Sequence, residues 1–180
     1  CQVRRCFWNW RKRINLFIFL FLIDIMPLKV LIYGPTQSGS TRIFNLVRMI
    51  FETKKMSVFS GWDIENLDLE YDVMVSKNHD SNPDYLDKFD IKILCIRNIL
   101  DVGISRQKRI LQGSIVIDEK TILDSCLFNI NILNRLKDTP DLITRYEDYS
   151  INEIRKIIDL LPVELNVLEI IEIMRDLDRM

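Results

Sequence analysis

The sequence predicts an α/β fold of three layers, in which helices cover both faces of a central parallel sheet. Two observations predict it: short, apolar, β-branched runs alternate with longer amphipathic stretches, and each run ends directly in glycine or polar residues. The chain has 180 residues, 48% of them hydrophobic, which suits one domain with a substantial core. We therefore expect a single α/β domain over residues 26–180.

The first strand is expected at residues 28–33, where the chain reads LKVLIY and then reaches Gly34. The loop GPTQSGST follows at residues 34–41. In the next stretch, RIFNLVRMIFE, the apolar residues at helical spacing are Ile43, Leu46, Val47 and Ile50. These features predict a unit of strand, glycine-containing loop and helix.

In the rest of the chain, expected strands continue to alternate with expected helices. Parallel strands joined in this way favour right-handed crossovers. Further strands are expected at residues 71–77, 91–96 and 141–146. A segment that begins at Pro83 and runs to Phe89 separates the first two of these strand candidates. We expect helices after Asp101, which can cap the first of them, and at residues 119–137, 151–160 and 164–177.

Polar segments directly follow three of the expected strands, at residues 34–41, 77–79 and 97–105. In parallel α/β sheets, ligands bind beyond the carboxyl ends of the strands. The fold would therefore bring these three segments, which are far apart in the sequence, to one crevice.

The segment 34–41 has the features of a P-loop-like phosphate-binding loop. A loop that leads into a helix N-terminus presents backbone N–H groups and the positive end of the helix dipole to an anion. Gly34 and Gly39 permit a tight backbone, and hydroxyl donors follow at Ser38, Ser40 and Thr41. The triphosphate loop GxxxxGK[ST] would have lysine where this chain has Ser40, which disfavours an ordinary ATPase or kinase. The alternative is a plain glycine turn.

Four segments between residues 28 and 160 resemble motifs of sulfotransferases that use 3′-phosphoadenosine-5′-phosphosulfate (PAPS), and they follow the family's order. Gln37-Ser38-Gly39-Ser40-Thr41 resembles the 5′-phosphosulfate loop, basic-Ser-Gly-[Ser/Thr]-Thr, except at its first position. RNILDVGIS at residues 97–105 resembles the 3′-phosphate motif R-[DN]-P-x-D-V-x-x-S, with Ile99 in place of proline. Lys77-Asn78-His79 resembles K-[TS]-H, and Arg145-Tyr146-Glu147-Asp148 resembles RYEDL.

This resemblance implies transfer of a sulfuryl group from PAPS, as cosubstrate, to a hydroxyl or amine of a small-molecule or glycan acceptor. It implies that His79 is the catalytic base and that Lys77 neutralises the transferred group. Arg97 and Ser105 would bind the 3′-phosphate, and residues 37–41 the 5′-phosphate. Residues 53–70 and 106–125 would line the acceptor pocket.

The chain departs from the family pattern in two places. Gln37 stands where the family has Lys or Arg, and Lys77 or Arg42 is the expected substitute. A C-terminal GxWK-like loop is missing, and Lys108 or Arg109 is the expected substitute there. Two alternatives therefore remain: a P-loop nucleotide kinase or NTPase, and a catalytically inactive nucleotide-binding relative.

Several residues have a simpler interpretation. Arg97 could pair with Asp101 instead of binding a phosphate. Tyr146 and Glu147 are interpreted as structural, with Glu147 paired to an arginine such as Arg145 or Arg155. The tryptophans at positions 8, 10 and 62 carry no functional signal.

Composition limits the partners and the compartment. The formal net charge is -1, so no overall basic field would attract nucleic acid. The cysteines lack metal-binding and disulfide-framework spacing, and we expect Cys95 and Cys126 to be reduced core residues. No metal site is predicted.

Residues 1–25 form a basic and apolar extension that we place outside the domain, with Met26 as the expected start. Their apolar run, residues 16–23, is about half of the ~20 residues that a membrane helix needs. We expect a cytoplasmic protein without firm membrane association. The alternative is anchoring through this segment, and the sequence leaves the oligomeric state open.

Overall fold

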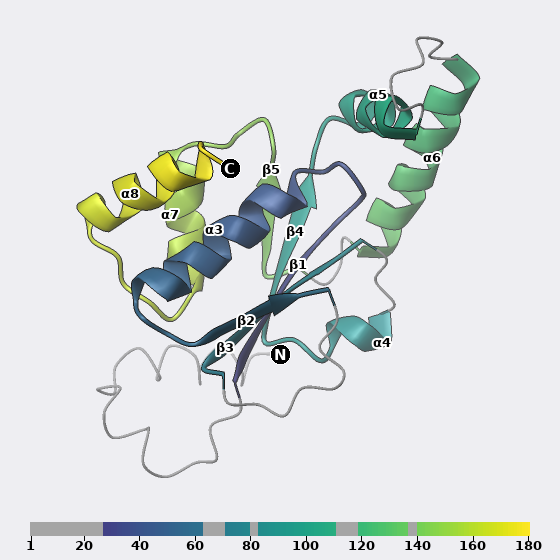
Figure 1. Cartoon of the computed structure of the whole chain (residues 1–180). Helices are drawn as coiled ribbons and strands as arrows, with labels where there is room; N and C mark the ends of the chain where they lie inside the picture. The colour runs from purple at the N-terminus through teal and green to yellow at the C-terminus, as the bar shows by residue number, and fades with distance from the viewer. Residues whose placement is uncertain (1–26, 63–70, 80–82, 111–118, 137–139) are drawn as a thin grey trace.

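A computed structural model of the chain describes residues 27–62, 71–79, 83–110, 119–136 and 140–180. It contains a five-stranded, all-parallel sheet in the order β2-β3-β1-β4-β5, with helices on both faces (Figure 1). This confirms the predicted α/β class and its three layers.

The described elements, in chain order, are β1 (Leu28–Tyr33), α3 (Ser40–Thr53), β2 (Val58–Gly61), β3 (Val73–Asn78), α4 (Pro83–Leu86), β4 (Ile91–Ile96), α5 (Ile99–Ile110), α6 (Glu119–Leu136), β5 (Leu142–Arg145), α7 (Ile151–Leu160) and α8 (Val167–Leu177). The bounds of β1 and β4 coincide with the predicted strands, and the later helices begin and end within three residues of the predicted ends.

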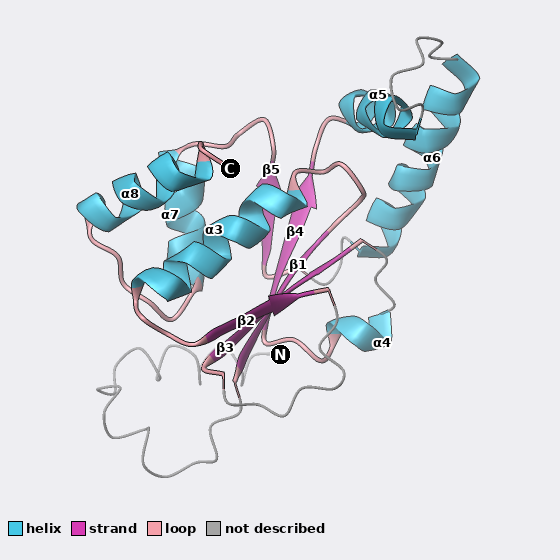
Figure 2. Cartoon of the chain, in the orientation of Figure 1, coloured by secondary structure: helices cyan, strands magenta, loops and turns pink. Residues whose placement is uncertain are grey.

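Strand β1 lies in the middle of the sheet and separates two cores, because successive side chains point to opposite faces. Val30 and Ile32 pack in one core with α3, α7 and α8. Leu31 and Tyr33 pack in the other core with α4, and half-buried residues of α6 adjoin it. Figure 2 shows these helical layers on either side of the strands.

The structure differs from the prediction at two elements. Strand β2 was not predicted, because its four residues are all only half-buried and it pairs with β3 alone at the edge of the sheet. Helix α5 begins at Ile99, ahead of Asp101. Asn98 takes the capping position, since its Oδ1 accepts the N–H of Leu100 at 3.0 Å and its carbonyl accepts the N–H of Val102 at 3.0 Å.

An aspartate directly precedes each of β3, β4 and β5, and its carboxylate accepts a backbone N–H from a neighbouring chain segment. The pairs are Asp72 with Ser57 at 2.7 Å, Asp90 with Lys29 at 3.0 Å and Asp141 with Lys92 at 2.8 Å. Each aspartate N–H in turn donates to the carbonyl of the same partner. These reciprocal bonds fix where the strands begin.

Cys95 and Cys126 are buried and free, as predicted, and burial raises the pKa of Cys95 to about 12. Within the described residues, no helix has both the length and the apolarity to cross a membrane, and no cluster of three or more His, Cys, Asp and Glu side chains is arranged to hold a metal. The prediction about residues 1–25 falls outside the described part of the chain.

Candidate functional site

At the carboxyl end of β1, the connections from neighbouring strands go to opposite faces of the sheet. From β1 the chain enters α3 on one face, while its neighbours β3 and β4 lead to α4 and, through α5, to α6 on the other face (Figure 1). Such divergence opens a crevice in which α/β proteins bind ligands. The segments 34–41, 77–79 and 97–105 all begin at this edge, as the sequence predicted.

In the loop after β1, both glycine positions leave no room for a side chain. Gly34 has φ 146° and Gly39 has φ 85°, in the region that side chains rarely adopt. A Cβ atom on Gly34 would lie 2.2 Å from the carbonyl oxygen of Cys95, and one on Gly39 would lie 2.4 Å from the ring of Tyr146. The loop therefore packs against β4 on one side and against the turn after β5 on the other.

Hydroxyl groups gather in this loop ahead of the first turn of α3. The helix begins at Ser40, and no side chain caps its N-terminus. Ser38 is 1% exposed, and its Oγ and the Oγ1 of Thr36 are buried without a hydrogen-bond partner among the described residues. Leaving such groups unpaired costs about 1–3 kcal/mol each, so a water or a polar ligand atom that bonds them would stabilise the loop.

Lys77 reaches the loop from the end of β3. Its Nζ donates to Oγ1 of Thr41 at 2.6 Å and lies 4.6 Å from the ring centroid of Trp62. The residue is only 8% exposed. The ammonium group is therefore held at the start of α3, between a hydroxyl and an aromatic face.

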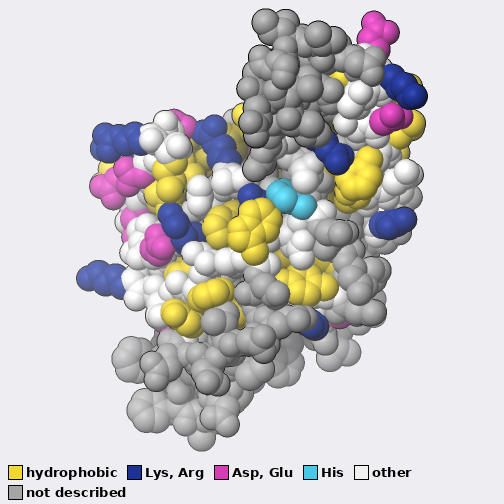
Figure 3. Space-filling model, turned by 45° about the vertical axis from the view of Figure 1, so that its right-hand side comes forward, with side chains coloured by type: hydrophobic (Ala, Val, Ile, Leu, Met, Phe, Trp, Pro, Cys, Tyr) yellow, Lys and Arg dark blue, Asp and Glu magenta, His cyan; other side chains and the backbone are white. Residues whose placement is uncertain are grey.

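His79 lies beside Lys77 at the same edge. Its Nδ1 is 3.0 Å from the carbonyl oxygen of Gly34, and because a carbonyl only accepts, a neutral ring carries its proton on Nδ1. The lone pair is then on Nε2. The rings of His79 and Trp62 are tilted with centroids 5.5 Å apart. In Figure 3 the single histidine, cyan, is visible at the surface beside hydrophobic and basic side chains.

Arg97 and Ser105, the two residues expected to bind one phosphate, lie within hydrogen-bond distance of each other. Nη1 of Arg97 donates to Oγ of Ser105 at 3.4 Å, whereas the alternative partner, Asp101, is not among its described contacts. The guanidinium lies 4.4 Å from the ring centroid of Tyr146. Tyr146 is also the ring against which Gly39 packs, so one aromatic side chain contacts both the loop and Arg97.

The expectation that Glu147 pairs with Arg145 or Arg155 was wrong. Its Oε1 accepts the backbone N–H of Asn98 at 2.7 Å. This hydrogen bond is the main cause that holds the pKa of Glu147 below its ordinary value, and the charges of Arg97 and Arg145 act in the same direction. The hydrogen bond of Glu147 thus links the turn after β5 to the turn after β4, which carries Arg97 and Asn98.

Arg42 and Lys77 were the two candidates to replace the basic residue that is missing at position 37. Arg42 pairs with Asp178 near the C-terminus and lies 3.9 Å from the ring centroid of Tyr149. It lines a narrow hollow between α3 and the turn after β5, together with Ser38, Gly39, Ile43, Thr144, Arg145, Tyr146 and Tyr149. Its described ion pair is thus with the C-terminal segment, whereas the described hydrogen bond of Lys77 is with a hydroxyl of the loop.

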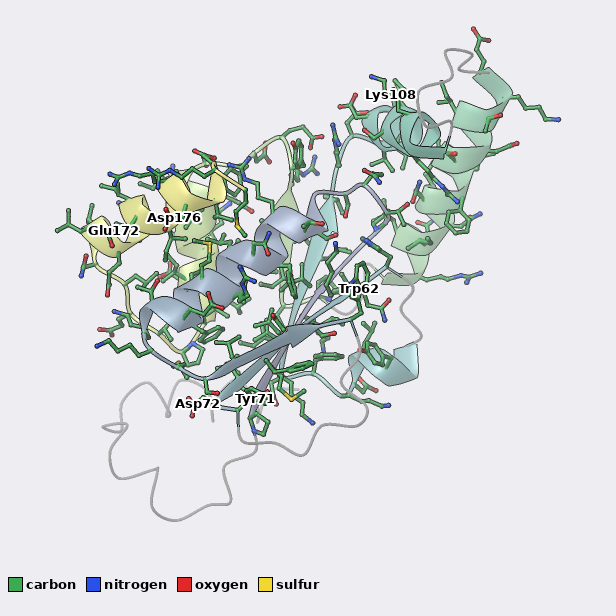
Figure 4. All side chains as sticks on the ribbon, in the orientation of Figure 1. Trp62, Tyr71, Asp72, Lys108, Glu172 and Asp176 are labelled. Atoms are coloured by element: carbon green, nitrogen blue, oxygen red, sulfur yellow. The ribbon has the colours of Figure 1, made fainter. Side chains whose placement is uncertain are left out.

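Trp62 contacts both Lys77 and His79, although the sequence assigned it no role beyond its place in the expected acceptor lining, residues 53–70. It follows β2 directly and is 61% exposed, and Figure 4 shows where it lies relative to the strands. The sequence signal for this position is weak: one tryptophan follows VFSG, a run too short and too little apolar to predict a strand. The two proposed substitutes for the C-terminal loop gain no support, because Lys108 is exposed on α5 and the side chain of Arg109 lies outside the described residues.

A scan against protein-family models finds no match for this chain, and a search of curated proteins finds none either. The functional interpretation therefore depends on the residues and their geometry.

Proposed function

We propose that this protein is a sulfotransferase that moves a sulfuryl group from PAPS to a hydroxyl or amine of a small-molecule or glycan acceptor. One observation carries the proposal. Two cation–hydroxyl pairs, Lys77 with Thr41 and Arg97 with Ser105, stand at the ends of the two strands that flank β1 and its glycine loop. Such pairs donate hydrogen bonds well to phosphate and sulfate oxygens.

The two pairs suit the two anionic ends of the donor. The N-terminus of α3, with the hydroxyls of residues 38–41, would hold the 5′-phosphosulfate. Arg97 and Ser105 would hold the 3′-phosphate. The orphaned Oγ of Ser38 and Nε of Arg97 are donors that would gain partners in such a complex.

In the proposed reaction, the acceptor oxygen or nitrogen attacks sulfur while the bond between sulfur and the bridging oxygen of the 5′-phosphate breaks. Nε2 of His79 takes the acceptor proton, and adenosine 3′,5′-bisphosphate leaves with the bond's electron pair. Negative charge spreads over the sulfuryl and bridging oxygens, as it does in phosphoryl transfer. Lys77 and the amides of the loop would stabilise that charge.

Calorimetry separates this proposal from its alternatives. A sulfotransferase or an inactive relative binds adenosine 3′,5′-bisphosphate more tightly than ATP, whereas a nucleotide kinase or NTPase does the reverse. Transfer of labelled sulfate from PAPS to a panel of hydroxyl and amine acceptors then separates the active enzyme from the inactive relative.

Two variants test the assigned chemistry. His79→Asn and Lys77→Met should each lower the rate of sulfate transfer by about a hundredfold, the usual effect of losing a proton acceptor or a charge-stabilising donor. Glu172→Gln, which changes an exposed carboxylate on α8, is the control. Full activity in both test variants would refute the assignment.

A further inference from the structure

We propose that Lys77 supplies the cation that the phosphate loop lacks at position 37, and that Trp62 is the positioning residue that holds Lys77 in place. The inference deepens the proposed function and depends on it. It concerns the one position at which the loop departs from the sulfotransferase pattern, where Gln37 brings no charge.

The loop's own geometry shows why another element has to bring the charge. Gln37 lies in the left-handed region with φ 66°, and its side chain is uncharged at every pH. Arg42, in the first turn of α3, is paired with Asp178. Among the described contacts of residues 34–41, the ammonium group that bonds a loop hydroxyl is that of Lys77, 2.6 Å from Thr41.

A lysine side chain needs a restraint to act as a fixed charge, because its four-carbon stem is flexible. Here the ammonium lies between the Thr41 hydroxyl and the Trp62 ring, a contact of the cation–π type. The same ring lies against His79, so it contacts both residues assigned to the chemistry.

The place of Trp62 in the fold supports a positioning role over a packing role. Its side chain is 61% exposed and belongs to neither hydrophobic core. Its backbone carbonyl accepts a hydrogen bond from Oγ of Ser76, at 3.4 Å, in the adjacent strand. That bond ties the residue after β2 to β3, the strand that carries Lys77.

A set of variants tests the inference by its kinetics. Trp62→Leu should lower kcat by about 3- to 30-fold, the range expected for the loss of a cation–π contact. Trp62→Phe keeps an aromatic face and should retain most of the activity. Leu168→Ala removes a comparably exposed apolar side chain, 72% exposed on α8, and should leave kcat unchanged.

Restoring the missing charge provides the decisive comparison. Gln37→Lys should raise kcat by a larger factor in the Trp62→Leu background than in the wild-type protein, because the two cations serve the same purpose. Equal factors in both backgrounds, or an unchanged kcat in Trp62→Leu, would overturn the inference.

A readout without catalysis keeps the two proposals distinguishable. The chain has one histidine, so its ring-proton NMR signals belong to His79, and the neighbouring Trp62 ring should shift them. Trp62→Leu should move these signals and Trp62→Phe should move them less; unchanged signals would refute the ring contact with His79, and with it the place of the Trp62 ring on which the positioning role depends. If wild-type protein fails to bind adenosine 3′,5′-bisphosphate, the proposed function fails. If it binds and Gln37→Lys gives no selective rescue, the inference about Lys77 and Trp62 fails while the proposed function stands.

Discussion

At Gly39, two separate constraints meet at one residue. The backbone has φ 85°, which costs a residue with a side chain about 1–2 kcal/mol, and the space where a Cβ would lie is occupied by the ring of Tyr146. The sequence indicated the first constraint through the pattern of the loop. It could not indicate the second, because Tyr146 is more than a hundred residues away and contacts the loop only through the sheet order.

Gly39→Ala should therefore destabilise the fold by about 2–4 kcal/mol in urea unfolding, with both the strained backbone and the steric overlap contributing. Adding Tyr146→Ala should recover part of the loss, because it removes the overlap but not the strain. If the double variant is as unstable as the sum of the single variants, the contact does not limit this position.

The hydrogen bond from the Asn98 amide to Glu147 makes the stability of the protein depend on pH. The folded-state pKa of Glu147 is lowered, first by the bond from the Asn98 amide, so its contribution to stability is present above the unfolded pKa of about 4.3 and is lost as pH falls through the folded value. Glu147→Gln keeps an acceptor for Asn98 but cannot titrate.

The unfolding free energy of the wild type should thus fall more steeply than that of Glu147→Gln as pH drops below about 4.3. Urea unfolding at pH 7 and at a series of acidic pH values measures the difference. The exposed Glu172→Gln variant is the matched control, and parallel pH curves for wild type and Glu147→Gln would contradict the assignment.

At the scale of elements, the sequence predicted the buried strands well and the edge strand not at all. β1, β3 and β4 have mostly buried residues, so they read as continuous apolar runs. The half-buried β2 gives no such signal, and its pairing is with β3, twelve or more residues further along the chain. The contacts of Trp62 with Lys77 and His79 were missed for the same reason, because they depend on β2 being a strand beside β3.

The aspartates that precede β3, β4 and β5 are a second feature that only the sheet order explains. Asp90→Ala should lower the unfolding free energy by about 1–2 kcal/mol, since it leaves the Lys29 amide without its carboxylate acceptor. This hydrogen bond is exposed to solvent, which limits the loss of free energy. Asp90→Asn retains an oxygen acceptor and should cost less, and equal losses in the two variants would show that charge, rather than the hydrogen bond, matters.

At the scale of the whole molecule, the three polar segments meet because all five strands are parallel, so that every carboxyl end lies at one edge. The alternation of strands and helices was enough to predict this. It did not predict that the turn after β5 links the segments, through Tyr146 to Gly39 and Arg97 and through Glu147 to Asn98. Those contacts depend on β5 lying beside β4, which no local pattern reveals.

If the loop and the Arg97–Ser105 pair hold two ends of one molecule, a ligand with both phosphates should stabilise the protein more than a ligand with one. At a hundred times its dissociation constant, adenosine 3′,5′-bisphosphate would add about 2.7 kcal/mol, which raises Tm by about 5–10 °C in a domain of this size. Adenosine 5′-monophosphate at the same concentration should give a smaller rise, because it leaves Arg97 and Ser105 without a partner. In Arg97→Ala the two nucleotides should give nearly equal shifts, since the 3′-phosphate then keeps only the neutral Ser105 hydroxyl as a partner. A bisphosphate advantage that survives Arg97→Ala would mean that the second phosphate binds elsewhere.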